Sequence, residues 1–113
     1  GRKMLKVKIC GITQVNDALH ACQYGADALG FIFAKSPRKI VPQNATEIIK
    51  CLPAFIAKAG VFVNADRALV LHIKRECKLD SLQFHDEDSD KYCDFFKKYS
   101  SRKVFSYNSR SLC

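Results

Sequence analysis

Ala28-Leu29-Gly30-Phe31-Ile32-Phe33 is a run of five apolar residues and one glycine. A strand of this composition can be buried on both faces, which is typical of parallel sheets covered by their connecting helices. Four further runs resemble strands, and they begin near residues 5, 57, 81 and 103. Successive runs start 22 to 29 residues apart, which is room for one strand and one helix. The recurrence predicts a sheet built from repeated strand–helix units.

The segments between these runs carry apolar residues at helical spacing. The first helix is expected to follow Thr13 as its cap and to end at Gly25, and the second to begin at Pro42. Asn64 or Asp66 can cap the third helix, and Ser89 can open a fourth. The buried faces expected for the four helices are Val15, Ala18, Leu19 and Cys22; Ala45, Ile48, Ile49 and Leu52; Leu69, Val70, Ile73 and Cys77; and Tyr92, Phe95, Phe96 and Tyr99.

This alternation predicts an α/β fold with about five parallel strands and four helices. If the strands keep their order, right-handed crossovers place every helix on one side and curl the sheet toward a (β/α)₈ barrel. A doubly wound sheet is the other possible closure, and the repeat length does not separate the two. The chain contains no linker or low-complexity segment, so residues 1–113 are expected to form a single domain.

The composition excludes several classes of protein. The chain has 113 residues and a net charge of +8, with 19 Lys and Arg against 11 Asp and Glu, and 48% of its residues are hydrophobic. This hydrophobic fraction is too high for a disordered chain. The longest apolar run, residues 28–34, is far shorter than the roughly 20 residues of a membrane span, and no secretory leader is apparent. The positive charge suits an anionic partner.

Six cysteines are spread irregularly along the chain and form no C-x-x-C pair. Zinc knuckles and thioredoxin-like redox sites are therefore not predicted, and no metal ligand set is apparent. Cys22, Cys77 and Cys93 fall on predicted apolar helix faces, where a free thiol behaves as a small hydrophobe. The pattern indicates a reduced, cytoplasmic protein.

Polar and reactive residues follow the predicted strands where each strand ends. Cys10 closes the first strand, Arg38 follows the second, Asn64 closes the third, and Gln83 and His85 close the fourth. Functional groups of parallel β/α folds collect at the carboxyl ends of the strands. One edge of the sheet is thus expected to carry a thiol, a guanidinium, two amides and an imidazole.

Five segments form a series of motifs along the chain: Lys8-Ile9-Cys10-Gly11-Ile12-Thr13, Gly25-Ala26-Asp27-Ala28-Leu29-Gly30-Phe31-Ile32-Phe33, Ser36-Pro37-Arg38, Gly60-Val61-Phe62-Val63-Asn64 and, as a looser match, Leu82-Gln83-Phe84-His85. Together they resemble the phosphoribosylanthranilate isomerase family of tryptophan biosynthesis. The resemblance covers about residues 4 to 99, and the tail at 106–113 diverges from the family pattern.

The resemblance implies a (β/α)₈ barrel that rearranges N-(5-phosphoribosyl)anthranilate to 1-(2-carboxyphenylamino)-1-deoxyribulose 5-phosphate without a cofactor. It assigns the general base to Cys10, whose thiol pKa the amides of the next helix could lower, and the anthranilate carboxylate to Arg38. Asn64, Gln83 and His85 are candidate substrate-binding residues. The family places Gly after this histidine, whereas Asp86 stands here.

The general-acid aspartate and the glycine-rich phosphate loops of the family have no counterpart in this chain, where no Gly follows Gly60. The sequence therefore predicts about half a barrel, weak or inactive alone, that associates with itself or with a complementary half. Two other readings remain open: a non-catalytic assembly protein, or a basic module that uses the acid-free segment from Lys97 onward. No nucleic-acid-binding motif accompanies that segment, so nucleic acid is not the expected partner.

Overall fold

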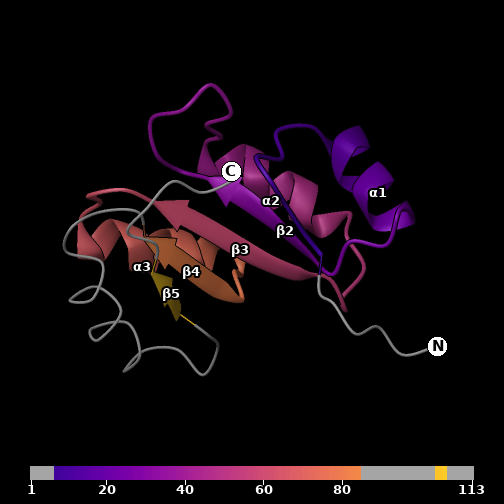
Figure 1. Ribbon diagram of the computed structural model, residues 1–113. Coiled ribbons are helices and arrows are strands. Elements are labelled where there is room, and N and C mark those ends of the chain that lie inside the picture. Colours follow the sequence, from indigo (N-terminus) through magenta and orange to yellow (C-terminus); the bar gives the residue numbers. More distant parts are fainter. Residues whose placement is uncertain (1–6, 85–103, 107–113) are drawn as a thin grey trace.

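The computed structural model describes residues 7–84 and 104–106, which form three helices and one parallel sheet of five strands (Figure 1). The strands are β1 (Lys8–Cys10), β2 (Ala28–Ile32), β3 (Ala57–Phe62), β4 (Ser81–Phe84) and β5 (Val104–Ser106). The helices are α1 (Val15–Gln23), α2 (Pro42–Lys50) and α3 (Arg67–Cys77). The fourth helix expected from Ser89 lies outside the described residues.

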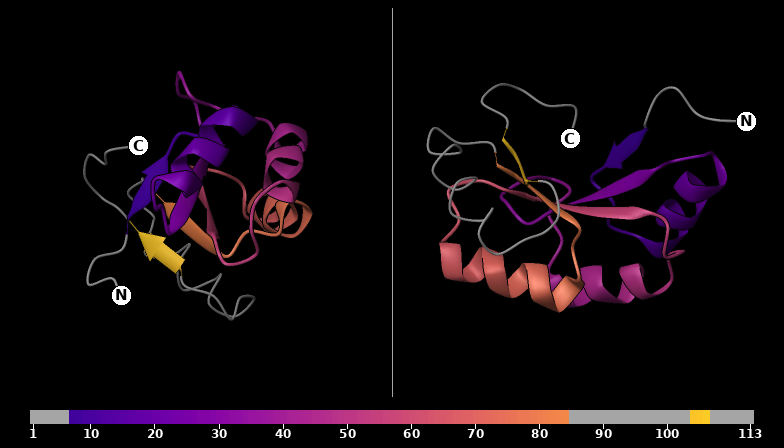
Figure 2. Two further views of the ribbon diagram at one scale, coloured as in Figure 1. Left: turned by 90° about the vertical axis from the view of Figure 1, so that its right-hand side faces the viewer. Right: turned by 90° about the horizontal axis from the view of Figure 1, so that it is seen from below.

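The strands lie in the sheet in the order β1-β2-β3-β4-β5, which is their order along the chain. The second view in Figure 2 shows α2 and α3 side by side on one side of the sheet. A doubly wound sheet reverses its strand order and carries helices on both faces. The described residues do neither, so their arrangement is that of a barrel segment.

The sheet has an outer face, which points toward the helices, and an inner face on the opposite side. Because side chains alternate along a strand, the registers between neighbouring strands assign each residue to a face. The outer face is formed by Ile9, Leu29, Phe31, Lys58, Gly60, Phe62, Leu82 and Phe84. The inner face is formed by Lys8, Cys10, Ala28, Gly30, Ile32, Ala57, Ala59, Val61, Ser81 and Gln83.

The hydrophobic core lies between the outer face and the helices. Phe62 is 1% exposed and stands between two other rings, with centroid distances of 5.4 Å to Phe33 and 6.0 Å to Phe84. The helices add small and branched residues to the same cluster, namely Ala18 and Ala21, Ala45 and Ile48, and Val70, Ile73 and Cys77. The apolar periodicity of the sequence therefore marked most of the covered face of α2 and α3 and part of that of α1.

Three residues expected in the core are exposed. Val15 and Leu19 of α1 are 37% and 39% exposed, and Ala21 is buried in their place. β1 is an edge strand, so within the described sheet no neighbouring unit covers the flank of α1 on that side. Leu69, in the first turn of α3, is also exposed, and Leu71 packs against the core instead.

The helix ends follow the sequence signals in part. Pro42 occupies the first turn of α2, and Gly25 follows α1 with φ of +92°, a conformation in which glycine carries no steric penalty. Thr13 does not cap α1, because the N-cap position falls one residue later on Gln14. Asp66 rather than Asn64 holds the N-cap position of α3.

None of the helices in the described part of the chain combines the length and apolar character that a membrane span needs.

Candidate active site

Cys10 ends β1 on the inner face, and its side chain lies against the backbone of the neighbouring strand. Its partner in the register is Gly30 of β2. A Cβ atom placed on Gly30 would stand 2.6 Å from the Cys10 Sγ and 3.2 Å from its Cα. Only glycine leaves room for the sulfur here, so the apolar run that forms β2 is interrupted where the cysteine must fit.

Arg38 reaches the same end of β1 from the loop between β2 and α2. The Arg38 backbone N–H donates to the Ser36 Oγ at 3.1 Å, and shortly after it the Ile40 N–H donates to the Ile32 carbonyl at 2.9 Å. These bonds tie the loop to the end of β2. The arginine side chain itself is exposed, as a group that meets a substrate should be.

Gly11, which follows Cys10, lets the Arg38 side chain pack against the backbone at the end of β1. A Cβ on Gly11 would lie 2.5 Å from the Arg38 Cδ and 3.0 Å from its Nη1. Gly11 also has φ of +87°, which other residues adopt only with strain. The structure thus places the Arg38 side chain against the residue that follows Cys10, at the strand end where the sequence expected both residues.

The two backbone N–H groups that follow Cys10 donate to a carbonyl of β2 and not to the Cys10 sulfur. The N–H groups of Gly11 and Ile12 both donate to the Gly30 carbonyl, at 3.0 Å and 3.2 Å, and α1 begins only at Val15. Both amides precede α1, so the influence of the first N–H groups of that helix on Cys10 stays a prediction.

Lys8 is a charged residue on the inner face two positions before Cys10, and it is only half-exposed. Burial lowers the pKa of its amino group to about 8, because a desolvated ammonium is disfavoured. Sequence reasoning did not single out this residue. Its signal was the alternation of Lys6, Val7, Lys8 and Ile9, which puts a lysine on the same face of the strand as the cysteine.

The cysteines differ in their oxidation state. Cys10 is disulfide-bonded, whereas Cys22, Cys51 and Cys77 are free thiols, so the expectation of a fully reduced chain does not hold at Cys10. Cys77 lies between α2 and α3, where it accepts a hydrogen bond from the Thr46 hydroxyl at 3.4 Å and donates one to the Pro42 carbonyl at 3.5 Å. Burial raises the pKa of the Cys77 thiol. Cys77 is thus an inert core residue.

Gln83 is buried on the inner face of β4, with 2% of its surface exposed. Its neighbours in the register are Val61 of β3 and Phe105 of β5. Within the described part of the chain, its Oε1 accepts no hydrogen bond. Because a buried unpaired acceptor destabilises a protein, this amide is poised to receive a donor.

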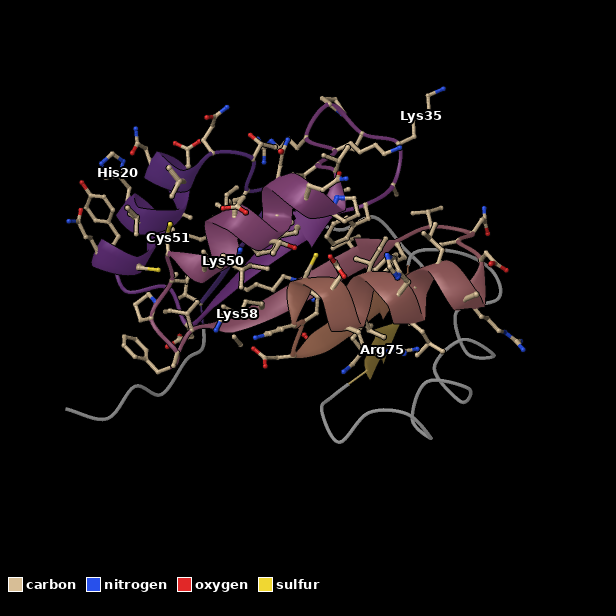
Figure 3. The ribbon with its side chains drawn as sticks, turned by 180° about the vertical axis from the view of Figure 1, so that it is seen from behind. His20, Lys35, Lys50, Cys51, Lys58 and Arg75 are labelled. Carbon is tan, nitrogen blue, oxygen red and sulfur yellow. The ribbon has the colours of Figure 1, made fainter. Side chains whose placement is uncertain are left out.

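The remaining candidates do not join the pair at β1. Asn64 is exposed after β3 with φ of +50°, so it forms a left-handed turn rather than a helix cap. His85, its neighbour Asp86 and the basic segment from Lys97 lie outside the described residues. His20 and His72 are exposed helix residues, as their positions in the sequence indicated, and Figure 3 shows His20 on α1.

Across residues 7–84 and 104–106 no three His, Cys, Asp or Glu side chains stand close enough together to hold a metal ion.

A family of sequences described as N-(5'phosphoribosyl)anthranilate (PRA) isomerase matches residues 7–110. The N-(5'-phosphoribosyl)anthranilate isomerase of Trichlorobacter lovleyi is 46% identical over 110 residues, which are 96% of this chain and 52% of the relative. The isomerase of Bacillus cereus strain B4264 is 57% identical over 86 residues, which are 75% of this chain and 42% of the relative.

Solved structures of the same family also resemble this chain. The phosphoribosyl anthranilate isomerase of Thermotoga maritima matches with a TM-score of 0.85 and 38% identity, over 91% of this chain and 50% of that one. A second structure, in complex with reduced 1-(o-carboxyphenylamino)-1-deoxyribulose 5-phosphate, matches with a TM-score of 0.86 and 38% identity over 91% and 53%. The chain spans about half the length of these relatives. Its fold is accordingly about half of their (β/α)₈ barrel, as the sequence predicted.

Proposed function

The chain belongs to the N-(5'-phosphoribosyl)anthranilate isomerase family, and from this we propose that it supplies the general base and the carboxylate-binding arginine of that isomerisation. The reaction converts N-(5-phosphoribosyl)anthranilate to 1-(2-carboxyphenylamino)-1-deoxyribulose 5-phosphate, an aldose–ketose rearrangement. A general acid protonates the ring oxygen of the ribose, and a general base then removes the proton from C2. Cys10 as a thiolate is that base.

The packing of the Arg38 side chain against Gly11, the residue after Cys10, carries this proposal. The fork of donors on Arg38 suits a carboxylate, because a guanidinium can form two parallel hydrogen bonds with it. An anthranilate carboxylate bound there puts the rest of the substrate over the carboxyl ends of the strands. The C2 proton then lies within reach of the Cys10 sulfur.

Gln83, Asn64 and His85 are proposed as further substrate-binding residues. The unpaired Oε1 of Gln83 suits a hydroxyl or N–H donor of the substrate. Asn64 closes β3 at the same edge of the sheet as Cys10 and Arg38, and the motif that it shares with the family supports its role.

We also propose that the chain needs a partner for catalysis. The isomerases that it resembles are about twice its length, and β1 and β5 each pair with one neighbour in the described sheet. A dimeric isomerase is known among the solved relatives. The partner is a second copy of this chain or a complementary half that brings the aspartate acid and the phosphate loops. A stable monomer in sedimentation at micromolar concentration would contradict this part of the proposal.

The proposed setting is the cytoplasm, where free thiols such as Cys22 and Cys51 persist.

We propose that residues 1–113 form one domain whose tail, 106–113, departs from the family pattern. No cofactor is needed by the proposed mechanism. Because the base must be a thiolate, turnover is expected only after the disulfide at Cys10 has been reduced.

The experiment that tests the function pairs this chain with the unmatched second half of the Trichlorobacter lovleyi isomerase, under reducing conditions. We expect the mixture to turn over phosphoribosylanthranilate, and the chain alone to show little or no activity. Cys10→Ala should lower turnover of the mixture by about 10²- to 10⁴-fold, which is the range for loss of a general base.

Cys22→Ala is the matched control, because Cys22 is a free thiol on α1 outside the site, and it should leave turnover unchanged. An active Cys10→Ala mixture would remove Cys10 from the base role. Robust turnover by the unpaired chain would overturn the need for a partner.

A further inference from the structure

We propose that Lys8 is a positioning residue that keeps the Cys10 thiol ionised, by forming an ammonium–thiolate pair with it on the inner face of β1. The inference rests on the proposed role of Cys10 as general base and deepens it. It supplies the positive charge that the amides of Gly11 and Ile12 do not provide, since both donate to the Gly30 carbonyl.

The two residues are placed for this pairing by the strand itself. Positions 8 and 10 lie on the same face of β1, one pleat repeat apart, and two residues of a strand span roughly 6.6 Å. A lysine side chain is long enough to bridge that interval. Across from them β2 presents Ala28 and Gly30, which are small, so nothing bulky on that strand separates the two side chains.

Partial burial of Lys8 strengthens the attraction between its ammonium group and a Cys10 thiolate. Because Lys8 is partly withdrawn from water, its charge is less screened than that of a surface lysine. The pKa of about 8 brings the amine close to the ordinary range of a thiol, so a proton can pass from the Cys10 sulfur to a neutral Lys8 amine with little change in free energy. The S–H bond breaks, an N–H bond forms, and each charge then stabilises the other.

Two other charged residues near β1, Arg38 and Asp27, are placed differently from Lys8. Arg38 comes from the β2–α2 loop and packs against Gly11, and it is assigned to the substrate carboxylate. Asp27 lies at the opposite end of β1, where its Oδ2 accepts the Val7 N–H at 2.7 Å. The inner-face residues of β2 that flank β1, Ala28 and Gly30, do not titrate.

The test measures the ionisation of Cys10 without any need for turnover. After reduction with a phosphine, the rate of iodoacetamide alkylation at Cys10 is followed against pH by mass spectrometry of the peptide that contains it. We expect Lys8→Met to raise the apparent pKa of Cys10 by about one unit or more, and Lys8→Arg to keep it near the wild-type value.

Lys58→Met is the matched control. Lys58 is also a partly buried strand lysine, but it lies on the outer face, and Figure 3 labels it in the view from the helix side. It should leave the alkylation profile of Cys10 unchanged. If Lys8→Met and wild type have the same profile, the proposal is wrong.

A second measurement works in the reverse direction and does not depend on a Lys8 variant. The pKa of the Lys8 amine is determined by NMR in the reduced chain and in Cys10→Ser. Because the coupling is reciprocal, we expect the Lys8 pKa to be lower in Cys10→Ser than in the reduced wild type. Equal values would overturn the proposal. If Cys10→Ala kept full activity in the paired enzyme, the base role would fail while this coupling could still be measured.

Discussion

The outer and inner faces of the sheet carry different kinds of side chain, although the same strands form both. The outer face packs aromatic and branched residues against three helices, and apart from Lys58 its members are apolar residues or glycine. The inner face carries an amine, a sulfur and a buried amide among Ala28, Gly30 and Ala59. The residues that stabilise the fold and the residues proposed for catalysis thus lie on opposite faces of one sheet. Substitutions on the outer face should mainly change the free energy of unfolding, and substitutions on the inner face should mainly change turnover.

The largest effect on stability is expected on the outer face. Phe62→Ala removes a buried ring that touches two others, and it should lower the free energy of unfolding by about 3–5 kcal/mol. Urea denaturation of the reduced chain measures the change. Phe55→Ala is the matched control, since Phe55 is 83% exposed, and it should change stability by less than about 0.5 kcal/mol. Equal losses would show that the ring cluster on the outer face does not carry the stability of the chain.

Two glycine substitutions compare the faces directly. Gly30→Ala places a methyl group against the Cys10 sulfur, so in the paired enzyme it should lower turnover by roughly 10²-fold through misplacement of the base. Gly60→Ala places its methyl group against Leu79 on the outer face. It should lower stability by about 1–3 kcal/mol through overpacking and leave the activity of the folded enzyme intact.

Turnover and urea unfolding are measured for both glycine variants to test whether the two faces have separate effects. A Gly30→Ala enzyme with full activity would show that the sulfur need not lie flat against β2. A Gly60→Ala enzyme that folds but has lost activity would show that the outer face also shapes the site.

The smallest expected effect concerns the pH dependence of stability. The Lys8 pKa of about 8 lies below the usual lysine value near 10.4, so between these pH values the unfolded chain binds more protons than the folded one. Stability should therefore rise as the pH increases from 8 to about 10.4. Because Lys8 is half-exposed, solvent screening limits the rise to about 1 kcal/mol.

Unfolding of the chain with Cys10 in its disulfide form, at several pH values in this window, measures the rise. Lys8→Met should abolish it and should raise stability at pH 7 slightly, because no desolvated ammonium remains. The same rise in Lys8→Met would show that another group causes it.

The sequence predicted much of the fold because the relevant signals are local. Ala28–Ile32 forms a strand, Pro42 begins a helix and Gly25 ends one, as their compositions indicated. Errors arose where burial depends on a neighbouring unit. Val15 and Leu19 have the right spacing for a core face, yet they flank an edge strand and remain exposed.

The candidate site was predicted less completely. Strand ends and motifs pointed to Cys10 and Arg38, and the structure places the Arg38 side chain against the residue that follows Cys10. Lys8 was missed, because its role depends on a face that period-two alternation suggests but only the sheet register fixes. The buried state of Gln83 also came from the structure.

What the sequence determined by itself was the repeated strand–helix unit, the parallel sheet and the residues at its carboxyl edge, since hydrophobic spacing and turn residues act over a few positions. The tertiary structure decided between a barrel segment and a doubly wound sheet, because strand order is a long-range property of pairing. It also decided which glycines are needed for close approach. Gly11 and Gly30 are required by the side chains of Arg38 and Cys10, which reach them only once β1, β2 and the following loop are assembled.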